Sequence, residues 1–516
     1  MLPRTMRTSM IVMICLFGTI DGARILAIFP YPIKSHYVVY EPLLKALSAK
    51  GHEITAVTHF PQKVHLANFT DVDVSSSSMN WTNNRAVDHF SIWTSFKFML
   101  NSKEHCEHVL DRSEVKQIVN AKEHFDLLLS EIFITDCMLG FAHVLNISKI
   151  VGVTSTTGLP WLNSIVRNPE NPSYIPNFHS SYSDQMSLIE RLYNTAVLLI
   201  SKFVYRIGSD WISYNTAKNY FGYDLPNFDT LRSKISLILI NGHPAVSTVR
   251  PLAPRVKEIA GIHIPISGPK PLPVDLQDYL DSQSSNGVIY FSLGSQIDMS
   301  TIPDQVFAAL YRAFEQVPQQ ILWTCAKGRM PSLPRNVKCI GWAPQLSVLC
   351  HPNTRLLINH GGLLGIQEAI YCGVPIIGIP IFGDHFLNMA HVVKKGLALE
   401  IKMEEFSYKQ FSSSLKEILS NKSYTETARK ISLQFKDRPM PPIEEAVYWV
   451  EHTIRHDLDF LKTGAIELTW YQYLLLDVAL IFISILLFVI WFSYKLIVCL
   501  LSTKKKAHIV RMKKMK

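Results

Sequence analysis

The chain has 516 residues, of which 48% are hydrophobic and 18% are charged. This length allows two or more ordinary domains, and a composition this apolar excludes a disordered chain. The formal net charge is +9, but seven basic residues follow Ser502 with no acidic residue among them, which leaves about +2 for the rest. A basic nucleic-acid-binding face on the folded part is therefore disfavoured.

The N-terminus has the pattern of a secretory signal peptide over residues 1–23. Two arginines precede an apolar stretch from Met10 to Ile20, and the small residues Gly22 and Ala23 follow it. This order of basic, apolar and small residues is typical of a cleaved leader that directs the chain to the secretory pathway. A short buried helix is the alternative interpretation.

From residue 24 to 265 the chain alternates short β-branched runs with helical patterns. "RILAIF" (Arg24–Phe29) predicts a strand, residues 37–50 an amphipathic helix that ends at Gly51, and residues 53–60 a second strand. A strand, a helix and a strand in this order form a βαβ unit. The pattern predicts an N-terminal α/β domain with a largely parallel sheet.

The same pattern restarts at Gly287 with "GVIYFSLGS" and continues to about residue 465. Residues 261–276, "GIHIPISGPKPLPVDL", hold four prolines and two glycines, so residues 266–286 are predicted to be a linker. The chain therefore predicts two doubly wound, Rossmann-like domains that face a cleft. Ligands of such sheets bind beyond the carboxyl ends of the strands.

One turn in the second half has the composition of an anion site. A predicted strand, "RLLIN", is followed by His360, Gly361 and Gly362 and then by a predicted helix. Free backbone N–H groups at a helix N-terminus favour an anion, and glycines let a phosphate approach closely. Glu368, further along this helix, could accept hydrogen bonds from ribose hydroxyls; alternatively, it complements the helix dipole.

Near the C-terminus, Val478 to Tyr494 contains no charged residue, and apolar residues extend it on both sides. This is long enough to cross a bilayer, so residues 473–495 are predicted to be a transmembrane helix; a buried core helix is the alternative. Aromatic residues before the run and lysines after it predict a lumenal body and a basic cytosolic tail over residues 496–516. Lys513 and Lys514 resemble a dilysine retrieval signal of the endoplasmic reticulum, although a solvated charge run is also open.

Sequons and cysteines bear on the compartment. Four Asn-X-Ser/Thr sequons are compatible with a lumenal body, although several would arise by chance; they lie at Asn68, Asn80, Asn146 and Asn421. Of eight cysteines, Cys15 lies in the predicted signal and Cys499 in or beside the predicted span. The other six show no metal-site spacing, so buried free thiols are expected, with one disulfide left open.

The segment Trp342–Asn388, "WAPQLSVLCHPNTRLLINHGGLLGIQEAIYCGVPIIGIPIFGDHFLN", resembles the signature of UDP-glycosyltransferases. It is most similar to the membrane-bound UDP-glucuronosyltransferase-like enzymes of animals, with features of the insect branch. Supporting matches are "SHYVVYEPLLKALSAKGHEITAVT" near the start and "VIYFSLGS" in the second half. The predicted leader, lumenal body, single span and dilysine tail fit the same family.

The resemblance implies a GT-B fold whose N-terminal domain binds an acceptor and whose C-terminal domain binds a UDP-sugar. It implies transfer of a hexose, glucose or glucuronic acid, to the hydroxyl of a small lipophilic acceptor, as in detoxification at the endoplasmic reticulum membrane. The insect-like features favour glucose. The UDP-sugar is a co-substrate, and no metal or separate cofactor is implied, because helix dipole and backbone donors stabilise the departing UDP.

The same resemblance carries residue roles onto the second half. Trp342 would stack on uracil, while Gln345 and Glu368 would hydrogen-bond the nucleoside. The diphosphate would meet Ser295, His360 and the backbone of the glycine turn, and Asp384 would bind sugar hydroxyls. A packing role is the alternative for each. The residues implied in UDP-sugar binding are Ser295, Trp342, Gln345, His360, Gly361, Gly362, Gly365, Glu368, Asp384 and His385.

The chain departs from the usual pattern of this family in two places. Leu364 and Gly365 replace the Asn and Ser that many members have in the turn, which leaves phosphate contact to backbone donors. His385 stands where the family generally has Gln, and an imidazole cannot reproduce the paired hydrogen bonds of an amide. Sugar choice and rate are therefore open, and a catalytically silent lumenal binding protein of the same fold is the alternative function.

The chemistry needs a base that takes the proton of the acceptor hydroxyl while its oxygen attacks the anomeric carbon and inverts it. The resemblance assigns this role to His36, in the loop predicted after the first strand. An acid would orient the base, and "FDLLLSEIFITDC" offers two. Glu131 has the family's distance from the preceding strand, whereas Asp136 has the usual side chain and is slightly favoured, because this branch often reads "DC" here.

The acceptor pocket is expected within residues 80–223, where "FSIWTSFKFML" suggests an apolar, hydroxyl-bearing small molecule. The same apolar stripe is also typical of plain core. One helix would hold the protein in the membrane, no nucleic-acid partner is expected, and a homo-oligomer is left open.

Overall fold

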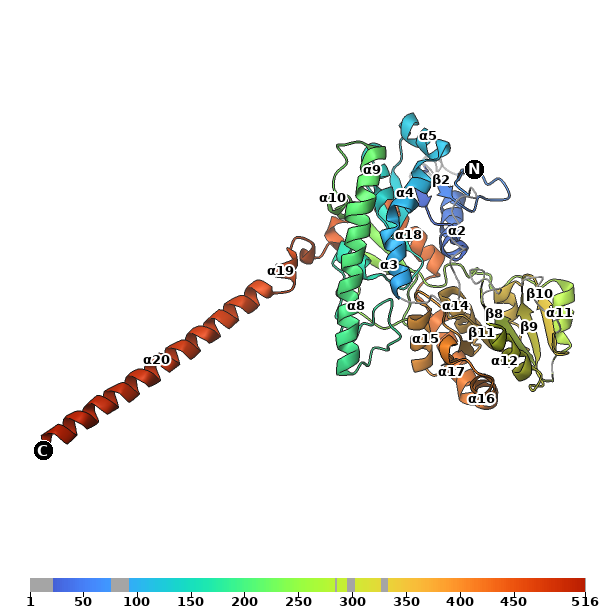
Figure 1. Ribbon diagram of the computed structural model, residues 1–516. Coiled ribbons are helices and arrows are strands. Elements are labelled where there is room, and N and C mark those ends of the chain that lie inside the picture. Colours follow the sequence, from blue (N-terminus) through green and yellow to red (C-terminus); the bar gives the residue numbers. More distant parts are fainter. Residues whose placement is uncertain (1–21, 76–91, 284, 295–301, 326–332, 516) are drawn as a thin grey trace, which may run out of the picture. The chain divides into compact units, whose positions relative to one another are not determined.

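The computed structural model of the chain describes residues 22–75, 92–283, 285–294, 302–325 and 333–515 (Figure 1). Its contacts divide it into two units, one that ends at Leu461 and one from Lys462 to Lys516, and each is described by itself. The predicted signal peptide lies almost wholly outside the described residues.

The first sheet has seven strands in the order β3-β2-β1-β4-β5-β6-β7, and every neighbouring pair is parallel. Parallel strands need crossover helices that cover the faces of the sheet, which explains why all residues of the two strands β4 and β5 are buried. The strands are β1 (Arg24–Phe29), β2 (Glu53–Thr58), β3 (Phe69–Asp73), β4 (Leu127–Glu131), β5 (Ile150–Thr154), β6 (Ile235–Ile240) and β7 (Val256–Glu258).

Helices fill the connections of this sheet (Figure 1). The longest of them, α8, begins with a capping box in which Ser187 and Glu190 satisfy each other's backbone N–H groups. The helices are α2 (Lys34–Ala49), α3 (Ile92–Leu100), α4 (Ser102–Leu110), α5 (Ser113–Ala121), α6 (Gly140–Val144), α7 (Pro160–Val166), α8 (Leu188–Arg206), α9 (Tyr214–Phe221) and α10 (Phe228–Ser233), with a 3-10 turn η2 (Cys137–Leu139) and a π-helical segment η3 (Ile207–Ser213).

The second sheet has six parallel strands in the order β10-β9-β8-β11-β12-β13. Its strands are β8 (Val288–Ser292), β9 (Gln320–Thr324), β10 (Val337–Ile340), β11 (Thr354–Asn359), β12 (Ile376–Gly378) and β13 (Ala398–Glu400). The helices that follow β8 in the chain are α12 (Asp304–Phe314), α13 (Gln345–Leu349), α14 (Leu363–Cys372), α15 (His385–Lys394), α16 (Tyr408–Ser420), α17 (Lys422–Lys436) and α18 (Pro442–Arg455). The prediction of two doubly wound α/β sheets is confirmed.

In each sheet the direction of winding reverses once. The reversal falls between β1 and β4 in the first sheet and between β8 and β11 in the second. The loops that leave such a pair of strands diverge to opposite faces and open a crevice at the carboxyl ends, where ligands of doubly wound sheets bind. The segments after these four strands are therefore where a site is expected.

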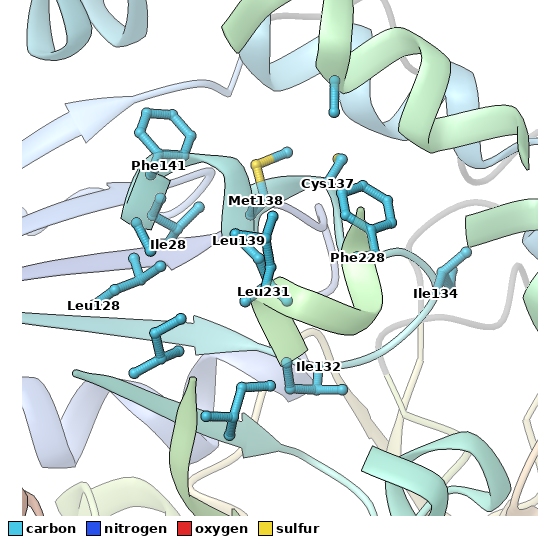
Figure 2. Close-up of a cluster of buried hydrophobic side chains, with 14 of the residues drawn as sticks. Ile28, Leu128, Ile132, Ile134, Cys137, Met138, Leu139, Phe141, Phe228 and Leu231 are labelled. Atoms are coloured by element: carbon cyan, nitrogen blue, oxygen red, sulfur yellow. The ribbon is translucent and has the colours of Figure 1, made fainter. Parts of the chain in front are cut away.

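Apolar packing fixes the segment that follows β4. Side chains from β1 and β4 meet those of η2 and α10 in one buried cluster, which Figure 2 shows. The labelled members are Ile28, Leu128, Ile132, Ile134, Cys137, Met138, Leu139, Phe141, Phe228 and Leu231. Because the side chains of this cluster are apolar and buried, the chain from Glu131 to Leu139 has little freedom to shift.

Two details depart from the predicted division of the chain. The predicted linker, residues 266–286, contains helix α11 (Val274–Asp281), whose Leu276 and Leu280 are buried with the second sheet. Helix α18 lies in the range predicted for the second domain, yet its Ala446, Val447 and Val450 pack in the cluster of the first sheet. The chain thus returns to the first domain before it reaches its last helix.

The structure joins six cysteines as three disulfides, Cys106–Cys137, Cys325–Cys339 and Cys350–Cys372. The expectation of buried free thiols is therefore wrong, because sequence spacing alone gives no distance between cysteines that the fold brings together. Disulfides of this kind belong to proteins of an oxidising compartment. Cys499 is free and exposed.

The C-terminal unit holds α19 (Trp470–Tyr473) and the 39-residue helix α20 (Leu476–Lys514), which Figure 1 shows in red. The apolar part of α20 is long enough to cross a membrane and none of its residues is buried within the chain. The helix begins three residues after the predicted start of the span and continues through the predicted tail. At 1.5 Å per residue it extends about 58 Å, roughly twice the hydrocarbon core of a bilayer.

Candidate active site

The first crevice brings a histidine and a carboxylate together. His36 lies in the first turn of α2, whereas the sequence predicted a loop there, and Glu131 is the last residue of β4. Nδ1 of His36 lies 2.6 Å from Oε1 of Glu131, with side chains 15% and 1% exposed. One ring nitrogen is thus held by the acid, which leaves Nε2 as the nitrogen that can accept a proton.

Two aromatic residues complete the surroundings of this pair. The hydroxyl of Tyr40 donates to the same Oε1 of Glu131 at 2.9 Å, and the ring of Phe133 meets the ring of His36 edge-on at 4.8 Å. Tyr40 lies four residues after His36 on α2, so both side chains are on one face of the helix. Tyr40 was not predicted from the sequence, although its spacing of four residues from His36 was a usable signal.

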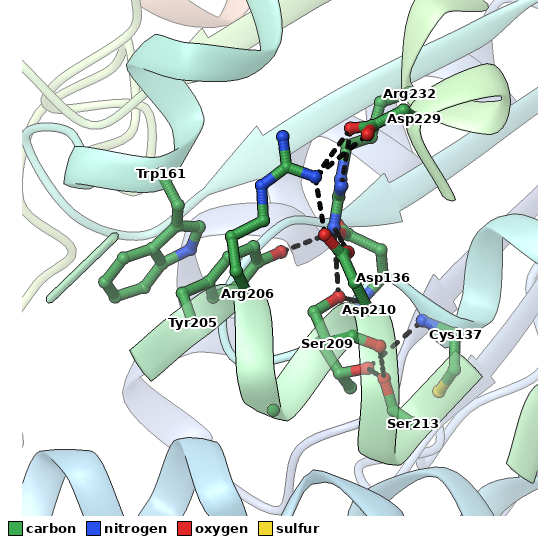
Figure 3. A network of polar contacts seen from close by, with 12 residues as sticks. Asp136, Cys137, Trp161, Tyr205, Arg206, Ser209, Asp210, Ser213, Asp229 and Arg232 are labelled. Carbon is green, nitrogen blue, oxygen red and sulfur yellow. Dashed lines mark hydrogen bonds and ion pairs between the residues drawn. The ribbon is translucent and has the colours of Figure 1, made fainter. Parts of the chain in front are cut away.

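Asp136 lies in a different network, which Figure 3 shows. Its Oδ2 accepts hydrogen bonds from the hydroxyl of Tyr205 at 2.6 Å, from Oγ of Ser209 at 3.1 Å and from Nε of Arg232 at 2.7 Å. The side chain of Arg232 is only 6% exposed and also pairs with Asp210. The charge of Asp136 is paired with that buried guanidinium. The structure thus brings Glu131, and not the slightly favoured Asp136, into contact with His36.

The second crevice contains the histidine and glycine turn between β11 and α14. Gly361 has a φ of +81°, which a side chain would strain, and Gly362 caps the first turn of α14 without a side-chain hydrogen bond. The backbone N–H groups at this helix N-terminus therefore have no side-chain acceptor from the cap residue. This arrangement can hold an anion, as the sequence predicted.

His360 is clamped between two glycines. A Cβ at Gly294, whose φ is +77°, would lie 2.5 Å from Cε1 of the His360 ring, and one at Gly362 would lie 2.5 Å from its Nε2. Burial lowers the pKa of His360 to about 4, so the ring is neutral near pH 7. Its Nδ1 is buried and has no hydrogen-bond partner among the described residues. Ser295, the other side chain implied at the diphosphate, lies outside them.

A carboxylate and an amide meet beside this turn. Nε2 of Gln345, the first residue of α13, donates to Oε2 of Glu368 at 2.5 Å, and burial raises the pKa of Glu368 to about 7. Gly365 lies next to them, because a Cβ there would be 3.3 Å from Nε2 of Gln345. Trp342, three residues before Gln345, is 77% exposed, so a face of its large ring is open to a planar partner.

Asp384 caps α15 close to both crevices. Its Oδ2 accepts a hydrogen bond from Nδ2 of Asn388 at 2.9 Å, and the same amide donates to the carbonyl of Gly361 at 3.1 Å. Burial raises the pKa of Asp384, while the bond from Asn388 and the nearby charge of His36 oppose this shift. His36 of the first domain and Asp384 of the second therefore lie within electrostatic range of each other. Asn388 was not identified from the sequence.

His385 packs rather than extending into solvent. It is 5% exposed, its Nδ1 accepts a hydrogen bond from the backbone N–H of Phe382 at 3.3 Å, and its ring meets that of His360 edge-on at 4.6 Å. A Cβ at Gly361 would lie 3.2 Å from Cβ of His385. His385 thus packs against the glycine turn, and its contact with a sugar stays a prediction.

The remaining predicted positions lie apart from both crevices. Asn68, Asn146 and Asn421 are exposed, as a glycan would require, and Asn80 lies outside the described residues. In the stretch predicted to line an acceptor pocket, Phe96 and Met99 are buried in the core, whereas Trp93 is 67% exposed. Glycosylation and acceptor contact both stay predictions.

Comparison with known proteins identifies the family. The family model described as "UDP-glucoronosyl and UDP-glucosyl transferase" matches residues 33–513. UDP-glucosyltransferase 2 of Dactylopius coccus is 37% identical over 473 residues, which is 90% of each chain, and UDP-glucuronosyltransferase 2B17 of Mus musculus is 30% identical over 493 residues, again 90% of each. A solved UDP-glucose: anthocyanidin 3-O-glucosyltransferase superposes with a TM-score of 0.58 at 18% identity, over 84% of this chain and 100% of that one, which confirms the GT-B fold. The chain belongs to the family of UDP-glucuronosyl and UDP-glucosyl transferases.

Proposed function

We propose that this UDP-glycosyltransferase moves a hexose to the hydroxyl of a small lipophilic acceptor, with inversion of the anomeric carbon and with His36 as the base. The observation that carries the proposal is the 2.6 Å contact between Nδ1 of His36 and Glu131. A carboxylate at Nδ1 selects the tautomer that carries its proton there, and so leaves Nε2 free to act. A catalytically silent binding protein would have no use for such a pair.

The step is a single displacement. The acceptor hydroxyl gives its proton to Nε2 of His36 while its oxygen forms a bond to the anomeric carbon from the face opposite UDP. The bond between that carbon and the diphosphate oxygen breaks, and UDP departs with the electron pair. Glu131 stabilises the imidazolium that forms, because an opposite charge at hydrogen-bond distance favours the protonated ring.

UDP is proposed to occupy the second crevice. The backbone N–H groups after Gly361 and the N-terminus of α14 would meet the diphosphate, and the neutral His360 would donate one hydrogen bond to it. Glu368, held by Gln345, would accept from the ribose hydroxyls, and Trp342 would stack on uracil. Asp384 would bind hydroxyls of the sugar, since it lies between the glycine turn and His36.

Glucose is the proposed donor sugar. The similarity to an insect UDP-glucosyltransferase at 37% identity supports this choice, as do the insect-type residues of the turn. The proposed setting is the endoplasmic reticulum membrane, with the body lumenal and α20 as the single span, and with detoxification as the role. Three disulfides and three exposed sequons fit a lumenal body.

The test is UDP release by microsomes that express the full chain, offered UDP-glucose or UDP-glucuronic acid separately with a panel of phenolic acceptors. His36→Ala should abolish release with the competent donor and leave UDP binding within about twofold, because His36 touches the acceptor and not the nucleotide. His124→Ala is the matched control, since that histidine is 75% exposed and precedes the start of β4, whereas Glu131 lies at the other end of that strand. Equal turnover in His36→Ala and wild type would refute the mechanism.

A further inference from the structure

Two tyrosines of the segment that carries His36 contact the segment that carries Glu131. Tyr31 lies between β1 and α2, is 2% exposed, and its hydroxyl oxygen accepts the backbone N–H groups of Ile134 at 3.1 Å and Thr135 at 3.2 Å. Its ring also meets Phe133 edge-on at 5.4 Å. The side chain of Tyr31 thus fixes the position of the loop after β4 relative to the loop after β1.

Tyr40 acts on the carboxylate itself. Its ring is fully buried and stacks on Phe29 at 4.4 Å with an interplanar angle of 16°, so its hydroxyl has one position. That hydroxyl donates to Oε1 of Glu131, the same oxygen that faces His36. Because Glu131 can rotate about three bonds, a second contact on this oxygen restricts the carboxylate to the rotamer that meets the imidazole.

The far end of the loop is anchored independently. Asp136 is bound to Arg232 (Figure 3), and a disulfide joins Cys137 to Cys106 of α4. Thr135 is held as well, since its hydroxyl donates to Ser213 at 2.6 Å. Between this end and Glu131, the backbone N–H of Ile132 donates to the carbonyl of Val153 at 2.8 Å and Nε1 of Trp161 donates to the carbonyl of Phe133 at 2.7 Å. The hydroxyls of Tyr31 and Tyr40 add the hydrogen bonds that join this stretch to the segment that carries His36.

We propose that Tyr31 and Tyr40 are positioning residues for the His36–Glu131 pair: Tyr31 holds the backbone after Glu131 and Tyr40 holds its carboxylate. This inference rests on the proposed function, because it assigns a role in the same proton transfer. Neither tyrosine touches the donor or the acceptor in this scheme, so their loss should act on turnover and not on binding. A displacement of about 1 Å in a catalytic group can cost about 100-fold in rate.

The experiment compares Tyr31→Phe, Tyr40→Phe and Tyr37→Phe in the full-length membrane protein, with radiolabelled UDP-glucose and the best phenolic acceptor of the wild type. Tyr37 is the matched control: it is 1% exposed on the same helix, and its hydroxyl has hydrogen-bond contacts with Gln62, at 3.4 Å, and with Thr58, both outside the loop that carries Glu131. Turnover is expressed per UDP-binding site, so that unfolded molecules do not count. Tyr40→Phe is also combined with Glu131→Gln.

The expected result is a tenfold or greater fall in kcat for Tyr31→Phe and Tyr40→Phe, with KM for UDP-glucose within twofold of wild type and Tyr37→Phe unchanged. Tyr40→Phe should add nothing to the loss caused by Glu131→Gln, because it acts through that carboxylate. Unchanged kcat in both variants, a change in KM alone, or a loss that multiplies with that of Glu131→Gln would overturn the inference. Silence of the wild type itself, with UDP bound, would instead refute the proposed function and the inference with it.

Discussion

Glu131→Gln and Asp136→Asn should separate the catalytic acid from the structural one. Both substitutions keep the size of the side chain and remove its charge. At Glu131 the change leaves an amide 2.6 Å from Nδ1 of His36, which no longer stabilises an imidazolium. At Asp136 it leaves the guanidinium of Arg232, itself 6% exposed, without its most buried carboxylate.

The two losses differ in kind. Removing the acid that orients a catalytic base typically costs about 10²–10⁴-fold in kcat, which is about 3–5 kcal/mol of transition-state stabilisation. Breaking one side of a buried ion pair costs about 3–5 kcal/mol of folding free energy. Arg232 keeps its contacts with Asp210 and Asp229, so the loss at Asp136 should fall at the lower end of that range.

The assay measures kcat per UDP-binding site together with the thermal unfolding midpoint. Glu131→Gln should have a midpoint close to wild type and almost no turnover, whereas Asp136→Asn should unfold several degrees earlier and keep most of its turnover per folded molecule. The reverse pattern, a stable and inactive Asp136→Asn beside an active Glu131→Gln, would refute the assignment of the acid.

Two further predictions concern the nucleotide crevice. Because the pKa of Glu368 is raised to about 7, the affinity for UDP-glucose should fall as the pH drops below 7, by up to about tenfold per pH unit. The reason is that the protonated acid accepts hydrogen bonds from the ribose less well. Calorimetry from pH 5.5 to 8 should show this fall, and Glu368→Gln should abolish it. Gly294→Ala should raise KM for UDP-glucose, because the added Cβ would collide with His360. Gly396→Ala is the control: Gly396 also has a positive φ, +78°, but a Cβ there would have no atom within 4 Å, so KM should stay unchanged. Equal KM values for the two glycine variants would show that His360 is not held as described.

Much of the framework could be read from the chain. The apolar runs at β1, β8 and β11 predicted parallel strands, because strands buried on both faces need apolar residues at every position. The turn at His360 was recognisable from two glycines between a strand and a helix, since few other residues accept a φ of +81°. These signals are local, because each depends only on residues that are close together in the sequence.

The partner of the base could not be read in this way. Asp136 is bound by Arg232, which lies 96 positions later in the sequence, and no residue close to Asp136 in the sequence indicates this contact. The strand end at Glu131 was the better signal, because the carboxyl ends of β1 and β4 meet at one edge of the sheet. The same limit applies to the disulfides: Cys106 and Cys137 are 31 positions apart and meet only because α4 packs against the loop after β4.

The placement of both half-sites follows from one topological rule used twice. His36 and Glu131 follow the two strands between which the first sheet reverses its winding, and Gly294 and His360 follow the corresponding pair in the second sheet. In the proposed mechanism neither crevice suffices alone, because the first would supply the base and the second would bind the diphosphate. Asp384 connects them, since it is bonded through Asn388 to the glycine turn and its pKa responds to His36. Helix α18, which returns across the division and packs Val447 and Val450 against the first sheet, adds an apolar connection between the two domains.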